Sequence, residues 1–262
     1  MAEHGARVGF VSSTAGPLRF AVRGPPASVP AQPLLLLHGL GDSIGGWARL
    51  AGPLARSFRV HLLDLPGHGL SAMPPDYRLG TLLEALVPYA AALERPLIAG
   101  HSLGGWLAAR LAQRLPRAAG LILINPAGAI LPREEWEPFR ALVSASDSSG
   151  ARRYLSRAFH SAPLPLRLFP GEVVKAMEAP ASRGFLESIV EADFLTAAEL
   201  ASLRLPVRLI WGESDRLLPA GTLAFFEQHL PNAEVVRLPR TGHLPHLESP
   251  RALARAIALP LR

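Results

Sequence analysis

Residues 100–104, with the sequence GHSLG, match the pattern G-x-S-x-G. The pattern follows a short apolar run at 97–99 and precedes a segment with helical spacing that starts near Leu103. Between a strand and a helix, this pattern predicts a tight turn that holds a serine hydroxyl out at the end of the strand. The amino-terminus of the helix adds positive potential there. We therefore predict that Ser102 is a nucleophile.

A serine hydroxyl is a weak nucleophile unless a neighbouring base removes its proton. His243 follows the apolar run 235–238 after a short loop, which predicts an imidazole near the end of a strand. His246 and His61 are the alternatives. His243 and His246 are also spaced as two metal ligands could be, but no third ligand is evident nearby. We predict that His243 is the general base, and we expect neither a metal nor a cofactor.

An acidic residue must orient the histidine, and in the chain order Ser–Asp/Glu–His it lies between the other two. Asp215 comes just after the apolar run 207–211 and 28 positions before His243. Glu213 is the nearest alternative, as a surface turn residue or as a support behind the site. We predict that Asp215 orients His243.

Acyl transfer also needs N–H donors for the developing oxyanion, each contributing roughly 2.7–4 kcal/mol. The backbone N–H of Leu103, directly after the nucleophile, is one candidate. The loop at 38–41, HGLG, follows an apolar run at 34–37, and the N–H of Leu40 is the second candidate. We expect His38 to brace this loop rather than to act as an acid or base.

Strands and helices that would position these residues follow from hydrophobic spacing. Up to residue 124 the predicted segments are strands 8–11, 18–22, 34–37, 58–65, 97–100 and 121–124, and helices 47–56, 79–93 (disturbed at Pro88) and 103–115. From residue 34 onward strands and helices alternate, which predicts a parallel, doubly wound α/β sheet. The first two strands are expected to be antiparallel.

The middle of the chain has a different pattern. Residues 128–205 show helical segments and proline breaks but no strong strand, which predicts a helical insertion over one end of the sheet; residues 144–150 are predicted as a polar loop. The last predicted elements are the strands 207–211 and 235–238 and the helices 220–230 and 251–259.

Composition limits the class of protein. The chain has 262 residues and no cysteine, so disulfides and thiolate metal sites are excluded. Its net charge is +6, but the arginines are scattered, with Arg152 and Arg153 the only adjacent basic pair, so we expect no nucleic-acid partner. No apolar run approaches the ~20 residues of a membrane span. Because residues 1–10 show no signal-peptide pattern, we expect a soluble cytoplasmic monomer or homodimer that acts on a small molecule.

Five motifs occur along the chain in an order typical of one family. They are HGLG at 38–41 with Trp47, DLPGHGLS at 64–71, and residues 100–105, 211–215 and 242–248. In these the chain resembles the α/β-hydrolase superfamily, in its single-domain, cap-bearing branch. The resemblance implies an eight-stranded, mostly parallel sheet with helices on both faces and a helical cap after strand 6.

The resemblance also implies a division of the chain. Residues 1–127 and 206–262 would form the hydrolase core, and residues 128–205 the cap. It supports the catalytic roles of Ser102, Asp215 and His243, and the oxyanion roles of Leu40 and Leu103.

The ordered set of Ser102, Asp215 and His243 favours hydrolysis of carboxylic esters of a small acyl or aryl substrate through an acyl-enzyme. A serine at the turn argues against haloalkane dehalogenases and epoxide hydrolases, which carry aspartate there. Carbon–carbon bond hydrolases of ring-fission products are an alternative, although they often have asparagine where this chain has His101 and tryptophan where it has Leu244. A triad-bearing ligand-binding protein with little turnover is another.

Substrate choice is expected to lie in the cap. Its aromatic residues are expected mostly to fill the cap's own core: Trp136, Phe139, Tyr154, Phe159, Phe169, Phe185 and Phe194. Arg152 and Arg153 are expected to be solvated rather than to bind a substrate carboxylate.

Overall fold

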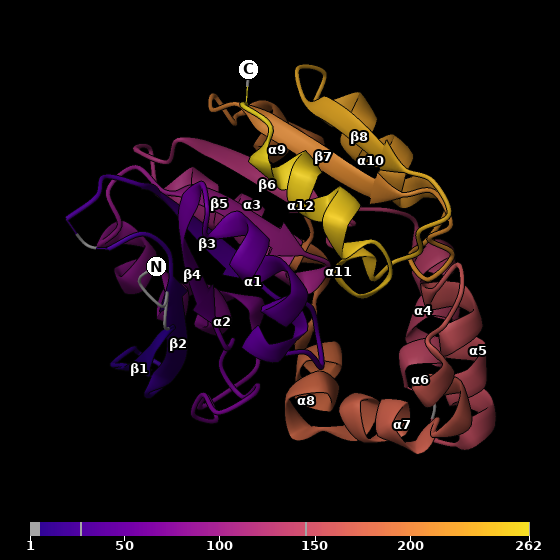
Figure 1. Cartoon of the computed structure of the whole chain (residues 1–262). Helices are drawn as coiled ribbons and strands as arrows, with labels where there is room; N and C mark the ends of the chain where they lie inside the picture. The colour runs from indigo at the N-terminus through magenta and orange to yellow at the C-terminus, as the bar shows by residue number, and fades with distance from the viewer. Residues whose placement is uncertain (1–5, 27, 145, 262) are drawn as a thin grey trace.

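A computed structural model describes residues 6–26, 28–144 and 146–261. Its eight strands form one sheet in the order β1-β2-β4-β3-β5-β6-β7-β8 (Figure 1). The strands are β1 Arg7–Val11, β2 Leu18–Arg23, β3 Gln32–Leu37, β4 Phe58–Leu63, β5 Leu97–His101, β6 Gly120–Ile124, β7 Val207–Gly212 and β8 Glu234–Leu238. Pairing is antiparallel where β2 meets β1 and β4, and parallel in the other pairs. The predicted eight-stranded, mostly parallel sheet is confirmed.

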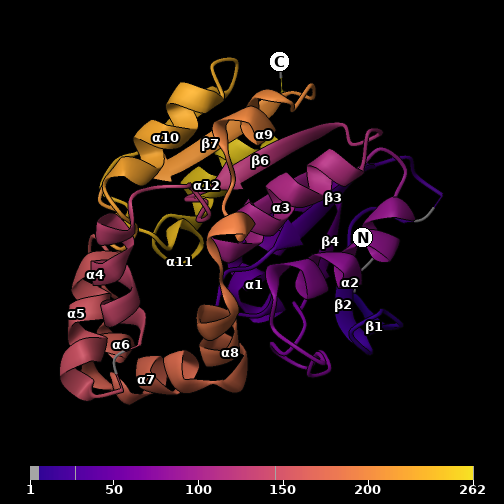
Figure 2. The ribbon, with the colours of Figure 1, turned by 180° about the vertical axis from the view of Figure 1, so that it is seen from behind.

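Helices cover both faces of this sheet. Figure 1 shows α1 (Ala48–Leu54) and α12 (Pro250–Ala258) on one face. Figure 2 shows α2 (Leu79–Ala91), α3 (Leu103–Arg114) and α10 (Gly221–His229) on the other. Neighbouring residues of β3 therefore enter different cores, Leu36 with α1 and α12 and Leu37 with α2 and α3. Because both faces are buried, the central strands are continuous apolar runs rather than alternating ones.

Helix α2 continues through Pro88, which has no N–H to donate to the carbonyl of Glu84 but does not end the helix. One local prediction was wrong. The predicted polar loop at 144–150 is partly helix, because α5 (Ser148–Ala158) begins inside it. The side chain of Asp147 accepts a hydrogen bond from the N–H of Gly150 and caps that helix.

Between β6 and β7 the chain forms the helical insertion, residues 128–205, in which the described residues contain no strand of the sheet. Its helices are α4 Arg133–Val143, α5 Ser148–Ala158, α6 Leu164–Leu168, α7 Gly171–Glu178, α8 Pro180–Ser188, the 3-10 helix η2 Glu191–Asp193 and α9 Ala197–Ala201. Figure 1 shows α4 to α8 as an arc to one side of the sheet. The boundaries of a core and a cap at 128 and 205 stay a prediction.

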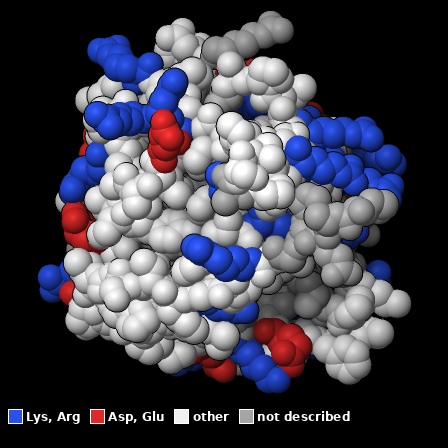
Figure 3. All heavy atoms as spheres, turned by 60° about the vertical axis from the view of Figure 1, so that its left-hand side comes forward, with Lys and Arg blue, Asp and Glu red and all other residues white. Residues whose placement is uncertain are grey.

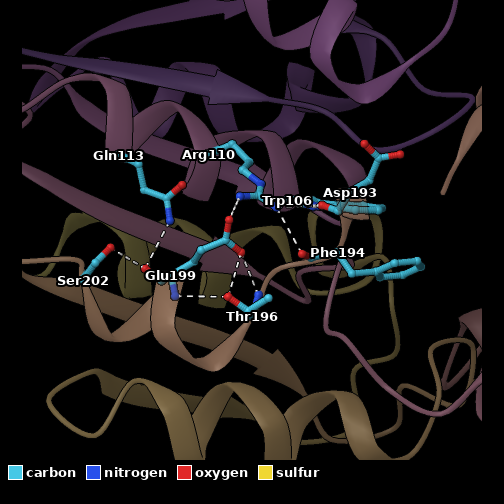
Figure 4. Close-up of polar contacts among 8 residues, drawn as sticks. All are labelled: Trp106, Arg110, Gln113, Asp193, Phe194, Thr196, Glu199 and Ser202. Carbon is cyan, nitrogen blue, oxygen red and sulfur yellow. Dashed lines mark hydrogen bonds and ion pairs between the residues drawn. The ribbon is translucent and has the colours of Figure 1, made fainter. Parts of the chain in front are cut away.

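Side chains of α3 bind the last part of the insertion, residues 193–199, where the chain returns to the sheet (Figure 4). Trp106 and Arg110 donate hydrogen bonds to the carbonyl of Asp193, over 3.0 and 2.9 Å. Arg110 also forms an ion pair with Glu199, and Gln113 donates to the Glu199 carbonyl over 3.1 Å. Trp106, Arg110 and Gln113 are four and three residues apart, so they share one face of the helix. The helix that follows Ser102 therefore also fixes the end of the insertion.

On the face shown in Figure 3, arginine and lysine side chains lie in separate groups among uncharged atoms, with Asp and Glu side chains beside several of them. They do not form the continuous basic stripe that a nucleic acid would require. Within the described ranges, no helix has the length and apolarity to cross a bilayer. Residues 1–5, on which the expectation about a signal peptide partly depends, lie outside the described residues.

Candidate active site

Ser102 occupies the turn between β5 and α3 with φ 53° and ψ −117°, a strained conformation for a residue with a side chain. The turn is possible because two glycines let the backbones approach. A Cβ atom on Gly100 would lie 2.0 Å from the carbonyl oxygen of Gly104, and one on Gly104 would lie 2.3 Å from that of Leu37. The glycines of the motif are therefore required by close contacts at this turn.

Asp215 and His243 meet although they are 28 residues apart in the chain. His243 Nδ1 lies 2.8 Å from Asp215 Oδ2, and their side chains are 3% and 0% exposed. The other carboxylate oxygen accepts from the backbone N–H groups of Leu217 and Leu218, at 2.9 and 3.3 Å. These donors stabilise a buried negative charge. Because Nδ1 faces Asp215, Nε2 is the ring nitrogen of His243 that remains for proton transfer.

Asn125 is a further partner of the carboxylate that the sequence reasoning missed. It directly follows β6, is fully buried, and has φ 40°. Its Nδ2 donates to Asp215 Oδ2 over 2.8 Å, and its Oδ1 accepts from the N–H of Gly212 over 3.2 Å. The sequence contained a signal for Asn125, because it is a polar residue directly after a buried strand. Such a residue lies at the edge of the sheet where the neighbouring parallel strands also end.

Ser102, His243 and Leu40 line one cavity of about 270 Å³. Leu103 does not line it, but its N–H belongs to the first turn of α3, where no earlier carbonyl of the helix can accept it. Neither this N–H nor that of Leu40 bonds to another group of the described chain. The structure thus brings Ser102, His243 and both candidate donors to one region, with Asp215 behind His243. Their catalytic roles stay a prediction.

The remainder of the cavity wall is largely apolar and comes mainly from the helical insertion. Its lining includes Phe139, Val143, Tyr154, Leu155, Phe159, Val173, Met177 and Leu186. The insertion also brings the polar side chains of Tyr154, Glu172 and Ser182 to this wall. Burial raises the pKa of the Tyr154 hydroxyl, so it stays protonated. A wall of this kind favours an apolar group on the substrate.

The expectation that most aromatic residues fill the cap's own core was wrong. Trp136, Phe185 and Phe194 pack in the main core beside Trp106 of α3, which stacks on Phe194 with ring centroids 5.0 Å apart. Phe169 is 67% exposed. The physical reason is the anchoring on α3, which brings the end of the insertion against the sheet's own helices.

Neither alternative histidine takes the place of His243. His61 lies on β4 with its Nδ1 2.9 Å from the Tyr89 hydroxyl, and burial lowers its pKa to about 4. His246 reaches the cavity wall, but its Nε2 lies 3.3 Å from Asp42 Oδ2. Among the described residues, these histidines belong to no group of three or more side chains arranged to hold a metal.

Glu213, the alternative to Asp215, has an exposed side chain and does not line the cavity. Arg152 and Arg153 are exposed as well and lie outside the cavity lining. The expectation that these two arginines are solvated is therefore confirmed.

Two buried histidines brace the loops around Ser102. His38 Nε2 accepts from the N–H of Leu65 over 3.0 Å, so its Nδ1 donates to the Gly39 carbonyl, 2.8 Å away. His101 Nε2 lies 2.7 Å from the carbonyl oxygen of His243 and ties that loop to β5. Burial is the main cause that lowers the pKa of both imidazoles. The bracing role expected for His38 is confirmed, whereas that of His101 was not foreseen.

Comparison with known proteins agrees with this architecture. The model of the alpha/beta hydrolase family matches residues 34–256. A pimeloyl-(acyl-carrier protein) methyl ester esterase of Chromobacterium violaceum is 30% identical over 241 residues, which cover 86% of this chain and 92% of that protein. The crystal structure of a bacterial membrane phospholipase A has a TM-score of 0.81 and 29% identity over 97% of this chain and 84% of its own.

A carbon–carbon bond hydrolase shares the fold. The 2-hydroxy-6-oxo-6-phenylhexa-2,4-dienoate hydrolase of a Rhodococcus strain has a TM-score of 0.78 and 22% identity, over 96% of this chain and 98% of its own. The family match spans most of the present chain, from β3 to α12. The chain is therefore a member of the alpha/beta hydrolase family and an enzyme of the hydrolase class.

Proposed function

We propose that this protein is a serine esterase that cleaves carboxylic esters through an acyl-enzyme on Ser102. The observation that carries the proposal is one cavity lined by both Ser102 and His243, with the buried carboxylate of Asp215 2.8 Å from the far nitrogen of His243. This is the arrangement of nucleophile, base and orienting acid that acyl transfer needs.

In the proposed reaction, His243 Nε2 takes the proton of the Ser102 hydroxyl as its oxygen attacks the ester carbonyl. The N–H groups of Leu40 and Leu103 then hold the negative oxygen of the tetrahedral intermediate. His243 returns the proton to the leaving alcohol, which departs and leaves an acyl-enzyme. Water, activated by the same imidazole, releases the acid and restores Ser102. Asp215, 2.8 Å from His243 Nδ1, stabilises the imidazolium that forms twice in each cycle.

We further propose that residues 128–205 act as a cap that selects the substrate. Ten of the 23 residues that line the cavity are apolar or aromatic residues of this segment, which favours a small acyl or aryl group. The Chromobacterium relative is named for a methyl ester, and a small alcohol of this kind suits a cavity of about 270 Å³. An apolar acyl or aryl group therefore agrees with the wall, and a small leaving alcohol agrees with the name of the relative.

Activity of Ser102→Ala on p-nitrophenyl butyrate tests the proposal, together with labelling by a fluorophosphonate. We expect kcat to fall roughly 10⁴-fold or more, and the label to be lost, because the covalent intermediate cannot form. Ser202→Ala is the matched control, since Ser202 is exposed and lies outside the cavity lining. Full activity of Ser102→Ala, or a label on another residue, would contradict the mechanism.

A small substrate screen separates the esterase from the alternatives. Esters of acetic, butyric, octanoic and benzoic acid are offered beside a vinylogous diketone. Release of two acids from the diketone, with no ester turnover, would assign a carbon–carbon hydrolase. Tight binding of an ester with negligible turnover would assign a ligand-binding protein.

A further inference from the structure

Helices α5 and α6 carry an uncompensated positive charge. Residues 148–171 contain four arginines and neither aspartate nor glutamate. Arg152 and Arg167 come from these helices, and Arg216 comes from the loop after β7. All three side chains line one surface groove of about 600 Å³. None forms an ion pair with a carboxylate of the described residues.

Large apolar side chains lie exposed on the same surface. Leu164 and Leu168 of α6 are 62% and 63% exposed and line the groove together with the arginines. The next residue, Phe169, is 67% exposed. Three such side chains within six residues are more than the scattered apolar residues of an ordinary surface. Figures 1 and 2 show α6 beside α5 in the part of the insertion remote from the sheet.

We propose that this surface, made of Arg152, Arg167 and Arg216 with Leu164, Leu168 and Phe169, binds peripherally to an anionic phospholipid bilayer. The apolar side chains enter the boundary between headgroups and acyl chains, and the guanidinium groups meet lipid phosphates. Arginine suits this position, because its fork of N–H donors matches phosphate oxygens.

The composition favours a lipid surface over an acidic protein. An acidic protein would compensate the arginines but would leave three large apolar side chains against charged groups. A bilayer satisfies both kinds of side chain at the same depth. The three arginines also form no ion pair with a described carboxylate, although Arg216 donates a hydrogen bond to the Ser156 carbonyl, so no such ion pair cancels their attraction to an anionic surface.

The location of α6 links this surface to the cavity. Leu166, between the exposed leucines, lines the cavity that contains Ser102. A bilayer in contact with α6 therefore lies one helix away from the cavity, next to the phase in which apolar esters dissolve. Binding itself does not depend on the proposed esterase activity, because it is measured with no ester present.

The test is cosedimentation of the full chain with vesicles, either of phosphatidylglycerol and phosphatidylcholine or of phosphatidylcholine alone. We expect binding to the anionic vesicles only, and weaker binding as salt rises. Arg152→Gln/Arg167→Gln should weaken binding about 25-fold, roughly fivefold for each charge removed. Leu168→Ser/Phe169→Ser should weaken it at least about tenfold.

Matched controls carry the same changes elsewhere. Arg56→Gln/Arg251→Gln removes two exposed arginines, and Phe10→Ser/Leu70→Ser removes two exposed apolar residues. Both controls should bind as the parent chain does, and all four variants should keep its activity on a water-soluble ester.

Three results would overturn the proposal: no binding to anionic vesicles, equal loss in the controls, or binding to polyglutamate as tight as binding to the vesicles. Loss of ester hydrolysis in Ser102→Ala has no bearing on vesicle binding, so failure of the proposed function would be recognised separately.

Discussion

Replacing Asn125 by alanine removes the side chain that supports Asp215 from the neighbouring strand. Asn125 is fully buried and makes two hydrogen bonds, to Asp215 Oδ2 at 2.8 Å and from the N–H of Gly212 at 3.2 Å. A hydrogen bond to a charged group contributes about 1.5–3 kcal/mol, and a buried N–H left without a partner costs about 1–3 kcal/mol. We therefore expect the free energy of unfolding to fall by roughly 3–5 kcal/mol.

Activity should fall less than it does when the acid itself is lost. Asp215 keeps its contacts with His243, Leu217 and Leu218 in the variant, three of its four N–H partners. Disabling the orienting acid of a serine enzyme lowers kcat about 10⁴-fold. Loss of one support out of four should therefore lower kcat about 10–100-fold, with a small change in KM, since Asn125 does not line the cavity.

The assay combines urea unfolding with steady-state kinetics on a p-nitrophenyl ester at a temperature where the variant is fully folded. Asn232→Ala is the control, because Asn232 is exposed. If Asn125→Ala kept kcat within twofold of the parent while losing the expected stability, Asn125 would be structural only. The carboxylate of Asp215 would then not need the support of Asn125 for catalysis.

Three further outcomes are expected. Arg110→Met should lower the free energy of unfolding, measured in urea, by about 2–3 kcal/mol, because Arg110 is the main link between α3 and Glu199. Arg114 is more exposed, so Arg114→Met should change the free energy of unfolding by less than about 1 kcal/mol. Burial lowers the pKa of His68 from 6.5 to about 4, so the imidazole takes up a proton in the unfolded chain at a higher pH than in the folded chain. The free energy of unfolding should therefore fall by about 2–3 kcal/mol between about pH 7 and pH 4.5, and by less in His68→Gln. Met177→Ala should enlarge the cavity, so that the ester screen shows a preferred acyl chain about two carbons longer. An unchanged preference would mean that Met177 does not limit the length of the acyl chain.

Sequence reasoning succeeded where a short pattern determines the backbone. The turn at Ser102 was predictable from Gly100 and Gly104, because any larger residue there would collide with neighbouring backbone carbonyls. The buried strands were predictable from continuous apolar runs. The contact between Asp215 and His243 was also predictable, because each residue comes shortly after one of two adjacent strands, β7 and β8. Parallel strands bring such positions to one edge of the sheet.

Sequence reasoning failed where a side chain chooses between distant partners. Helical spacing shows that Trp106 and Arg110 share a face, but not that this face receives the end of the insertion rather than another core helix. For the same reason the aromatic residues of the insertion could not be divided between cavity and core. Trp136 packs in the main core and Phe139 reaches the cavity, although both lie on α4, three residues apart.

Buried imidazoles around Ser102 place hydrogen-bonding groups beside the proposed base without adding positive charge. The rings of His101 and His243 have centroids 4.9 Å apart. If His101 were protonated, its charge would disfavour the imidazolium of His243 by about 3 kcal/mol at an effective dielectric constant of about 20, which is more than a 100-fold loss in rate. Burial lowers the pKa of His101 well below its usual value and prevents this. A neutral imidazole has one N–H, and His101 donates it to the His243 carbonyl, so its buried Nδ1 has no hydrogen-bond partner among the described residues. The same burial keeps His101 uncharged, and an uncharged His101 does not oppose the proton that the proposed base must accept.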